Sequence, residues 1–402
     1  MIISFHFSFF RKRRPKGILQ KKFEYVKAEL CIIKGMMKTK IYVMTHKKFE
    51  IPHDSMYVPV HVGRAENPNP ELLNYLGDDS GDSISERNCY YSELTGLYWV
   101  WKNVKDVDIV GTCHYRRYLL NHSGYMFRED EIREILKSYD FITTKTLDLN
   151  FSYYYGFGEN HKRYYLDETI KVLEDLYPEY AKTFLELVHQ KHTYFGNMMI
   201  CQKPLYDSYM DFLFETLFEL ERRITIDEED SYHRRIFGFI SEFLQFVWVK
   251  HHHLKVYECM VGMLGEKAET KEVKNRLAEY FKRGDFEGAK RYFLECKQKR
   301  PDILMEASDV TGELHLCMQV IVTAGMEQQA YGENILSRIS DFHDLMHYFN
   351  HLNAYHAQCL KGEPDEDILA WVKANQITEV AHQISEKVMQ SSIDCAINIS
   401  NI

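Results

Sequence analysis

Apolar positions in the first two thirds of the chain alternate between short β-rich runs and longer stretches with helical spacing. Short runs typical of buried strands occur at 40–44, 108–113, 139–144 and 194–201. Apolar residues recur at helical spacing over 83–103, 128–138, 167–190, 204–223 and 234–250. Strands that alternate with helices predict an α/β fold, with a mostly parallel sheet flanked by helices.

Two stretches of this part follow neither pattern. Residues 52–81 contain several Pro and Gly and few periodic apolar positions, and residues 151–161 are aromatic and interrupted by Gly. Both are predicted to be loops. Long loops in compact domains are usually functional or disordered, and the Tyr and Val content of 52–81 favours an ordered one.

The pattern changes after Gly265. Strand signals fade, and helical spacing continues at 269–284, 286–298 and 301–325. The segment 276–301 resembles one tetratricopeptide-like hairpin, but no second copy follows at that period. The sequence therefore predicts an N-terminal extension (1–37), an α/β domain (38–265) and an all-α C-terminal region (266–402).

The N-terminal extension joins the apolar run MIISFHFSFF to the basic run RKRRPK. Its charge follows the apolar part, whereas a secretory signal has its charge first. One interpretation is a short patch that contacts an anionic membrane surface. The favoured one is a start site upstream of the true start at Met36 or Met37, because the first convincing strand begins just after Met37. No apolar run reaches the ~18 residues of a membrane span, and we expect a cytoplasmic protein, at most peripheral to the inner membrane.

Composition excludes several classes of function. The net charge of −9 argues against a nucleic-acid partner, which requires a basic face. Nine Cys without a CxxC pair indicate reduced thiols instead of disulfides or a zinc site. The motifs of P-loop kinases, dinucleotide-binding dehydrogenases, zinc peptidases and serine hydrolases are absent from the sequence.

The densest polar cluster follows the strand at 108–113 and includes His114, Arg116 and Arg117. Ligands of open α/β folds bind where strands end. Guanidinium groups bind diphosphate oxygens in a bidentate geometry, and His114 can add a donor. A structural salt-bridge network is the alternative, but two Arg, a His and two Tyr together favour a ligand site.

Glu242 is the single acid between Arg235 and Lys250, in an otherwise apolar helix. A carboxylate in such a place either has a partner or has a raised pKa, which suits a general base. An ion pair with Arg234 or Arg235 is an equally weighted alternative.

Three weaker candidates lie in other segments. Glu93 lies in an aromatic helix, facing either solvent or a cleft. Asn197 follows Gly196 in a strand, where Gly allows close approach of a ligand and Asn offers a donor and an acceptor; the alternative is a β-bulge. Asp82 belongs to an acidic, Gly-punctuated loop that could hold a metal, although a helix cap by Asp82 or Ser83 is favoured.

Several blocks together resemble a known family. They are IYVMTHK, YVPVHVG, DDSGDSISERNCYYSELTGLYWVWKN and GTCHYRRY, followed by YFGNMMICQKPLYDSYMDFLFETLFELE and RRIFGFISEFLQFVW. From about Lys38 to Gly265 the chain resembles the bacterial capsular and exopolysaccharide glycosyltransferases often described only as a domain of unknown function. The layout is also similar to the Rossmann-like GT-A glycosyltransferase fold.

The resemblance implies a hexosyltransferase. Its donor would be a nucleotide-diphosphate sugar, such as a UDP-hexose, and its acceptor a glycan or lipid-linked oligosaccharide of capsular, exopolysaccharide or O-antigen assembly. In GT-A enzymes the first strand and its loop hold the nucleotide, which implies roles for Thr45 and His46. A later strand with a small residue and an Asn opens on the sugar, which implies a role for Asn197.

The resemblance also bears on metal and catalysis. A middle strand of GT-A enzymes usually ends in a metal-binding Asp-x-Asp, but here His-Tyr-Arg (114–116) stands in its place. We therefore expect no protein metal site and no obligatory cofactor, with Mn²⁺ or Mg²⁺ as an optional addition, since fixed Arg charge can stabilise a leaving diphosphate. Glu242 is the expected base, with Asp82 and Glu93 as weaker candidates.

Two rival functions remain at this point. A phosphotransferase acting on a sugar could use the same basic strand end, but it would need a nucleoside triphosphate. A non-catalytic scaffold could use the helical C-terminal region as its binding surface, and it would neither hydrolyse nor transfer a nucleotide sugar.

Overall fold

The computed structural model describes residues 37–226, 229–304, 308–362 and 364–390. The predictions about a start site or membrane patch within residues 1–36 lie outside this range. None of the described helices is both long and apolar enough to cross a membrane.

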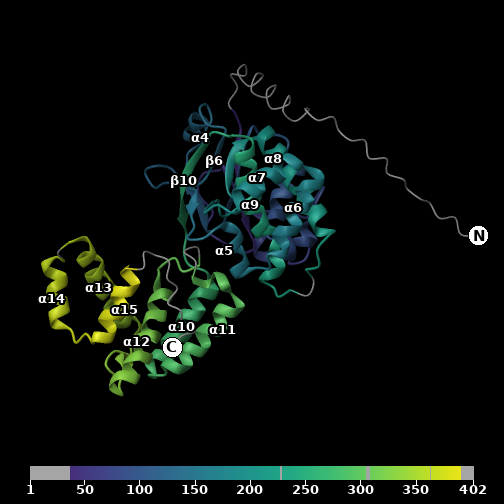
Figure 1. The fold of residues 1–402 in the computed structure, drawn as a ribbon. Helices are drawn as coiled ribbons and strands as arrows, with labels where there is room; N and C mark the ends of the chain where they lie inside the picture. Colours follow the sequence, from purple (N-terminus) through teal and green to yellow (C-terminus); the bar gives the residue numbers. More distant parts are fainter. Residues whose placement is uncertain (1–36, 227–228, 305–307, 363, 391–402) are drawn as a thin grey trace, which may run out of the picture.

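An eight-stranded sheet forms the centre of the first part (Figure 1), in the order β3-β2-β1-β4-β5-β10-β6-β9, with a further pairing between β4 and β9. Its strands are β1 (Thr39–Thr45), β2 (Tyr57–His61), β3 (Leu76–Gly77), β4 (Ile109–His114), β5 (Arg117–Leu120), β6 (Phe141–Thr144), β9 (Met199–Gln202) and β10 (Val256–Met263). Two short strands, β7 (Leu147–Asp148) and β8 (His192–Thr193), form a second sheet.

The expectation of a mostly parallel sheet is corrected, because the sheet is mixed. β1, β2, β3 and β4 pair in parallel, as do β6 and β10. β5 and β9, however, pair antiparallel with their neighbours. The pairings still give β1, β2, β4, β6 and β10 one common direction, so their carboxyl ends share one edge of the sheet.

Helices cover both faces of this sheet. They are α2 (Asn88–Tyr91), α3 (Leu94–Asn103), α4 (Glu129–Ile135), α5 (Tyr153–Asn160), α6 (Tyr164–Leu176), α7 (Pro178–Val188), α8 (Lys203–Glu221) and α9 (Ile236–His251). Along β1, Tyr42 and Met44 pack with α3 and α6 to α9, whereas Ile41 and Val43 pack with α4 on the opposite face. This alternation follows from the two-residue period of a strand, and Figure 1 shows α6 to α9 together on one side.

Three predicted segments differ from the structure. The stretch 52–81 contains β2 and β3; its Pro59 is tolerated because β3 pairs only with the two residues that follow it. The stretch 151–161 contains α5, in which Tyr153 stacks on Phe243 at 4.1 Å, so burial of aromatic rings outweighs the cost of two Gly. The helix expected at 167–190 is divided before Pro178, since the residue preceding a Pro is disfavoured in a helix.

Two further differences concern the site. The single helix expected at 83–103 is interrupted at Ser92, whose φ of +51° is left-handed. Strand β10 was not predicted at all, although it lies inside the sheet between β5 and β6. Most of its side chains are partly exposed, with Cys259 the one fully buried, so the apolar pattern of a central strand is missing.

The C-terminal part is helical in the described residues. It contains α10 (Ala268–Lys282), α11 (Phe286–Lys299), α12 (Glu313–Tyr331), α13 (Phe342–Lys361), α14 (Glu366–Ala374) and α15 (Glu379–Gln390), around a core of its own. The helix expected at 301–325 begins only at Glu313, where the Asp309 carboxylate accepts the backbone N–H groups of Leu314 and His315.

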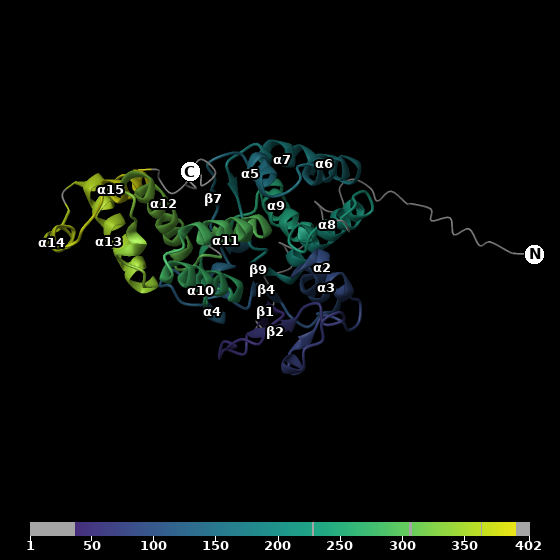
Figure 2. The same cartoon turned by 90° about the horizontal axis from the view of Figure 1, so that it is seen from below.

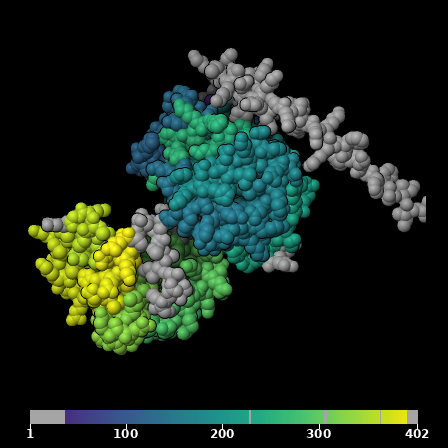
Figure 3. Space-filling view, in the orientation of Figure 1, coloured from purple at the N-terminus to yellow at the C-terminus, as the bar shows by residue number. Residues whose placement is uncertain are grey.

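The helical part lies at the carboxyl edge of the sheet. β10 runs in the direction of the parallel strands and α10 begins five residues after it ends. In Figures 1 and 2 the helices form a second lobe at this edge, and Figure 3 shows the same lobe as a separate bulge of the surface. Ligands of open α/β folds bind at this edge, so the helical lobe faces the expected site.

Candidate active site

The His-Tyr-Arg-Arg segment forms a tight hairpin between two strands. His114, the last residue of β4, pairs with Arg117, the first residue of β5, and Tyr115 and Arg116 form the turn between them. Arg116 therefore lies in the turn itself, whereas Arg117 begins β5. The Arg116 guanidinium lies 5.8 Å from the centre of the Tyr115 ring.

A left-handed turn at Gly196 and Asn197 lies against this hairpin. Their φ angles are +99° and +43°, conformations available to Gly and, among other residues, most readily to Asn. The Gly196 carbonyl accepts a 2.8 Å hydrogen bond from Nε2 of His114, and its N–H donates a 2.8 Å bond to Oε1 of Glu242. One backbone residue thus joins His114 to Glu242.

The side-chain amide of Asn197 holds the second carboxylate. Nδ2 donates to Oε1 of Glu93 at 2.8 Å and to the carbonyl of Gly238 at 3.2 Å, and Oδ1 accepts from the Ser241 hydroxyl at 3.0 Å. Asn197 is buried, and three protein groups occupy its amide. Its side chain therefore positions Glu93 against α9.

The break at Ser92 explains how Glu93 reaches this place. The Asn88 amide donates to the carbonyl of Ser92 at 2.7 Å, which ends α2, and Glu93 becomes the residue before the first turn of α3. An unbroken helix would have placed Glu93 within a regular face instead of at a helix end.

The two carboxyl groups differ in their pKa. Burial, and then the nearby charge of Glu93, raise the pKa of Glu242 to about 8. Burial also acts to raise the pKa of Glu93, but His114 and the Asn197 hydrogen bond outweigh it and lower the pKa overall. Two neighbouring acids whose pKa values are moved apart are typical of a site that transfers protons. Neither side chain is fully buried, so solvent and ligands can still reach them.

Arg117 and Arg235 lie beside this pair, and Arg116 lies in the adjoining turn. Arg117 lies next to the turn, where a Cβ added to Gly196 would be 3.8 Å from its Nη1. Arg235, just before α9, lies over the rings of Tyr232 and Phe239 at 5.7 and 5.5 Å, and its charge acts on the pKa of both carboxyl groups. Within the described part of the chain, neither Arg116 nor Arg117 nor Arg235 forms an ion pair with a carboxylate.

The loop after β1 lies on one side of this group of carboxyl groups and arginines, which we call the cluster. The Thr45 hydroxyl donates to the carbonyl of Lys47 and accepts from its N–H at 3.0 Å, which fixes the loop. The His46 ring meets the Tyr115 ring edge-on at 5.6 Å, and the Tyr115 N–H bonds to the carbonyl of Met44. Thr45 and His46 therefore lie against the arginine hairpin.

Asp82 is not brought into this cluster. Its carboxylate accepts from the Tyr98 hydroxyl at 2.9 Å, and its backbone bonds to the Asn103 side chain. Tyr98 and Asn103 lie along α3 away from Glu93, and Asn103 ends the helix, about 15 Å from its start.

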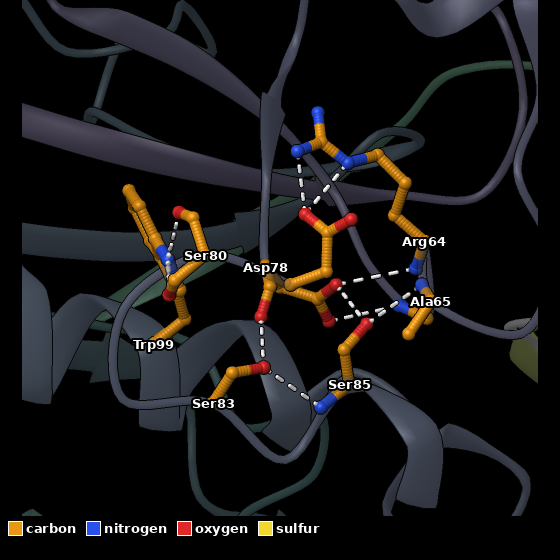
Figure 4. Close-up of polar contacts among 9 residues, drawn as sticks. Arg64, Ala65, Asp78, Ser80, Ser83, Ser85 and Trp99 are labelled. Atoms are coloured by element: carbon orange, nitrogen blue, oxygen red, sulfur yellow. Dashed lines mark hydrogen bonds and ion pairs between the residues drawn. The ribbon is translucent and has the colours of Figure 1, made fainter.

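The neighbouring Asp78 has a structural place that the sequence did not reveal (Figure 4). Its buried carboxylate accepts from the Arg64 N–H and the Ser85 hydroxyl, both labelled in Figure 4. It also accepts from the Gly63 N–H and the Thr95 hydroxyl. Four protein donors leave this carboxylate little capacity for a cation. Across residues 37–226, 229–304, 308–362 and 364–390, no three His, Cys, Asp or Glu side chains are grouped to hold a metal ion.

Arg235 stands out in the sequence only as a possible ion-pair partner of Glu242. The structure places it beside both carboxyl groups without such a pair. The sequence held one sign of a functional role, because Arg235 stands just before an apolar helix. A cation at the start of a helix is disfavoured by the helix dipole, so its presence there calls for an explanation other than helix stability.

Two comparisons relate this chain to known proteins. The model of the family described as "Domain of unknown function (DUF4422)" matches residues 40–253. A solved apo structure of WbbM, a bifunctional glycosyltransferase, is similar with a TM-score of 0.53 and 27% identity, over 57% of this chain and 46% of that one. The chain thus spans about half the length of that neighbour. No curated protein matches the chain.

The likeness to WbbM supports a glycosyltransferase-like protein, and the family match includes every residue of the cluster from Thr45 to Glu242. The family match extends over more than half of the residues of this chain, and the chain therefore belongs to the DUF4422 family.

Proposed function

We propose that this protein is a hexosyltransferase that moves a sugar from a nucleotide-diphosphate donor, a UDP-hexose in the first instance, to a glycan or lipid-linked acceptor of surface polysaccharide. One observation carries the proposal. Two carboxyl groups with opposite pKa shifts and three arginines without carboxylate partners meet at the edge of the sheet where α/β folds bind ligands. The similarity to a glycosyltransferase adds support.

The arginines are proposed to bind the donor diphosphate. Arg116 and Arg117 are half-buried, whereas Arg235 is exposed. A half-buried guanidinium without a protein carboxylate is costly to keep, and an anionic ligand offsets that cost. Arg116, Arg117 and Arg235 would stabilise the negative charge that grows on the diphosphate as it leaves. The Thr45–His46 loop beside them would contact the nucleotide.

Glu242 is proposed to be the base. The acceptor oxygen attacks the anomeric carbon, the bond from that carbon to the diphosphate oxygen breaks with its electron pair leaving on the diphosphate, and Glu242 takes the acceptor proton. The raised pKa makes Glu242 a stronger base than an ordinary carboxylate once it is ionised. Glu93, held by Asn197, would keep a negative charge near the cationic sugar of the transition state.

Fixed arginine charge supports a reaction that does not depend on a divalent metal. Mn²⁺ or Mg²⁺ remains compatible as an ion brought by the diphosphate itself. We place the reaction on the cytoplasmic side of the membrane, where nucleotide sugars are made.

Release of nucleoside diphosphate tests the proposal directly. The full chain is incubated with UDP-, GDP- and dTDP-hexoses, with and without oligosaccharide acceptors, and Glu242→Gln serves as the inactive control. We expect sugar-dependent release of the diphosphate by the wild type alone. Absence of binding to every nucleotide sugar would refute the proposal, and phosphate transfer from ATP to a sugar would favour a phosphotransferase instead.

A further inference from the structure

The polypeptide that leads into the helical lobe leaves the sheet beside the arginine hairpin. Met263, the last residue of β10, is paired with Arg117, and the next residue, Leu264, donates its N–H to the carbonyl of Arg116 at 2.8 Å. Only two residues, Gly265 and Glu266, separate Leu264 from Lys267. The start of the helical lobe is therefore fixed to the same two residues that the proposed function assigns to the diphosphate.

A second contact fixes the lobe to the nucleotide loop. Glu269, in the first turn of α10, forms an ion pair with Lys47 at 3.5 Å, directly after Thr45 and His46. The pair is exposed and contributes little stability by itself. It shows that the first turn of α10 lies over the carboxyl end of β1, consistent with the position of α10 in Figure 2.

Lys267 lies between these two contacts in the sequence and shares a carboxylate with a second cation. Its Nζ donates to Oδ2 of Asp302 at 3.0 Å and to the Ser308 hydroxyl at 2.8 Å, and Arg300 bonds to the same Asp302 oxygen at 2.9 Å. One carboxylate thus serves two cations. Burial lowers the pKa of Lys267 to about 8, and the positive charges of Arg300 and Arg117 add to that effect.

An ammonium group has three N–H donors, and the described contacts of Lys267 use two of them. The side chain is 22% exposed, so the third donor has access to a ligand. A phosphate oxygen beside Arg117 would relieve the repulsion between the two cations.

We propose that Lys267 is a fourth cationic ligand of the donor diphosphate, supplied by the start of the helical lobe, which makes this lobe part of the donor site. The inference rests on the proposed function and extends it to residues beyond the family match, which ends at residue 253. Lys267 would then both bind the diphosphate and belong to the helical lobe. A bound diphosphate would therefore stabilise the position of the lobe against the sheet, and the lobe would strengthen the binding of the diphosphate.

Calorimetric titration of the full chain with UDP tests this inference. Lys267→Gln is expected to weaken binding at least tenfold, and Lys267→Arg to restore most of it. Lys271→Gln, one turn further along α10 and exposed, is the matched control and should bind like the wild type. Asp302→Asn separates a ligand role from a structural one: it removes a partner of Lys267 without removing the cation, so binding should be as tight as in the wild type or tighter.

A second measurement needs no substitution. Acetylation of the wild type, followed by mass spectrometry, should modify Lys267, and UDP should protect Lys267 while Lys271 is modified equally with and without it. Equal binding by Lys267→Gln and Lys271→Gln, equal weakening by Asp302→Asn, or absence of protection would overturn the inference. If the wild type binds no nucleoside diphosphate, the proposed function fails as well; if it binds UDP and only the Lys267 results are negative, the inference alone fails.

Discussion

Replacing Glu242 by Gln should lower activity and raise stability above neutral pH. The acid has a pKa of about 8 in the folded protein and an ordinary value of 4.5 in the unfolded chain. Between these values the folded state holds a proton that the unfolded state has lost, so the free energy of unfolding falls as the pH rises from 4.5 to 8. Gln cannot ionise, and its amide oxygen can still accept the Gly196 N–H.

The size of the effect follows from the shift. A difference of about 3.5 pKa units corresponds to at most ~5 kcal/mol at about 1.4 kcal/mol per unit. Solvent reaches the Glu242 side chain in part, which weakens the penalty, and we expect ~2–3 kcal/mol above pH 8. Urea unfolding at pH 5 and pH 8.5 should therefore show a stability loss in the wild type that Glu242→Gln lacks.

Kinetics of the same two proteins complete the test. The wild-type kcat/KM should rise about tenfold per pH unit and level off near pH 8, whereas Glu242→Gln should be at least ~100-fold slower. Glu221→Gln is the matched control: that carboxylate accepts from the Tyr91 hydroxyl and Arg87, so its loss should lower stability and leave turnover intact. Full turnover by Glu242→Gln at pH 8.5 would refute the base role, and parallel stability curves would refute the raised pKa.

Three further predictions concern the arginines, the metal and the acidic loop. Arg116→Ala and Arg117→Ala should each lower turnover about 100-fold, or ~3 kcal/mol of transition-state stabilisation, with little change in the urea midpoint because neither forms an ion pair in the described structure; early unfolding of both variants would argue for a structural role. Affinity for a UDP-sugar, measured by titration, should be the same with and without EDTA; a loss restored by Mn²⁺ would contradict this. Asp78→Asn should reduce the free energy of unfolding by about 2–3 kcal/mol, since a neutral amide cannot accept all four donors, and an unchanged urea midpoint would show that the network contributes little.

Continuous apolar runs were the segments that the sequence predicted well. β1, β4 and β6 and helices α8 and α9 lie within a few residues of their expected places, because burial on both faces leaves a strong local signal. The mixed strand directions left no such signal, since direction depends on which strands pair. The position of β10 depends on its neighbours in the same way.

The candidate site also combines residues that the sequence made recognisable with residues whose place depends on the tertiary structure. Glu242 was recognisable alone, because a single acid in an apolar helix requires an explanation. The hydrogen bond between Glu93 and Asn197 could not be predicted in this way, because it depends on the helix break at Ser92 and on two left-handed residues at 196–197. Polar residue types indicated chemistry, but only the tertiary turns determine which of them share a site.

The place of β10 in the sheet has a consequence for how the chain can be divided. The family match ends at residue 253, which is the natural point to truncate the protein for expression. A chain cut there would lose β10 and leave the facing edges of β5 and β6 without their hydrogen-bonding partner. Open edges of this kind pair with other molecules, so the shorter protein should aggregate. The smallest fragment expected to stay free of such aggregation therefore extends beyond Met263, and the boundary set by sequence similarity falls inside a structural unit.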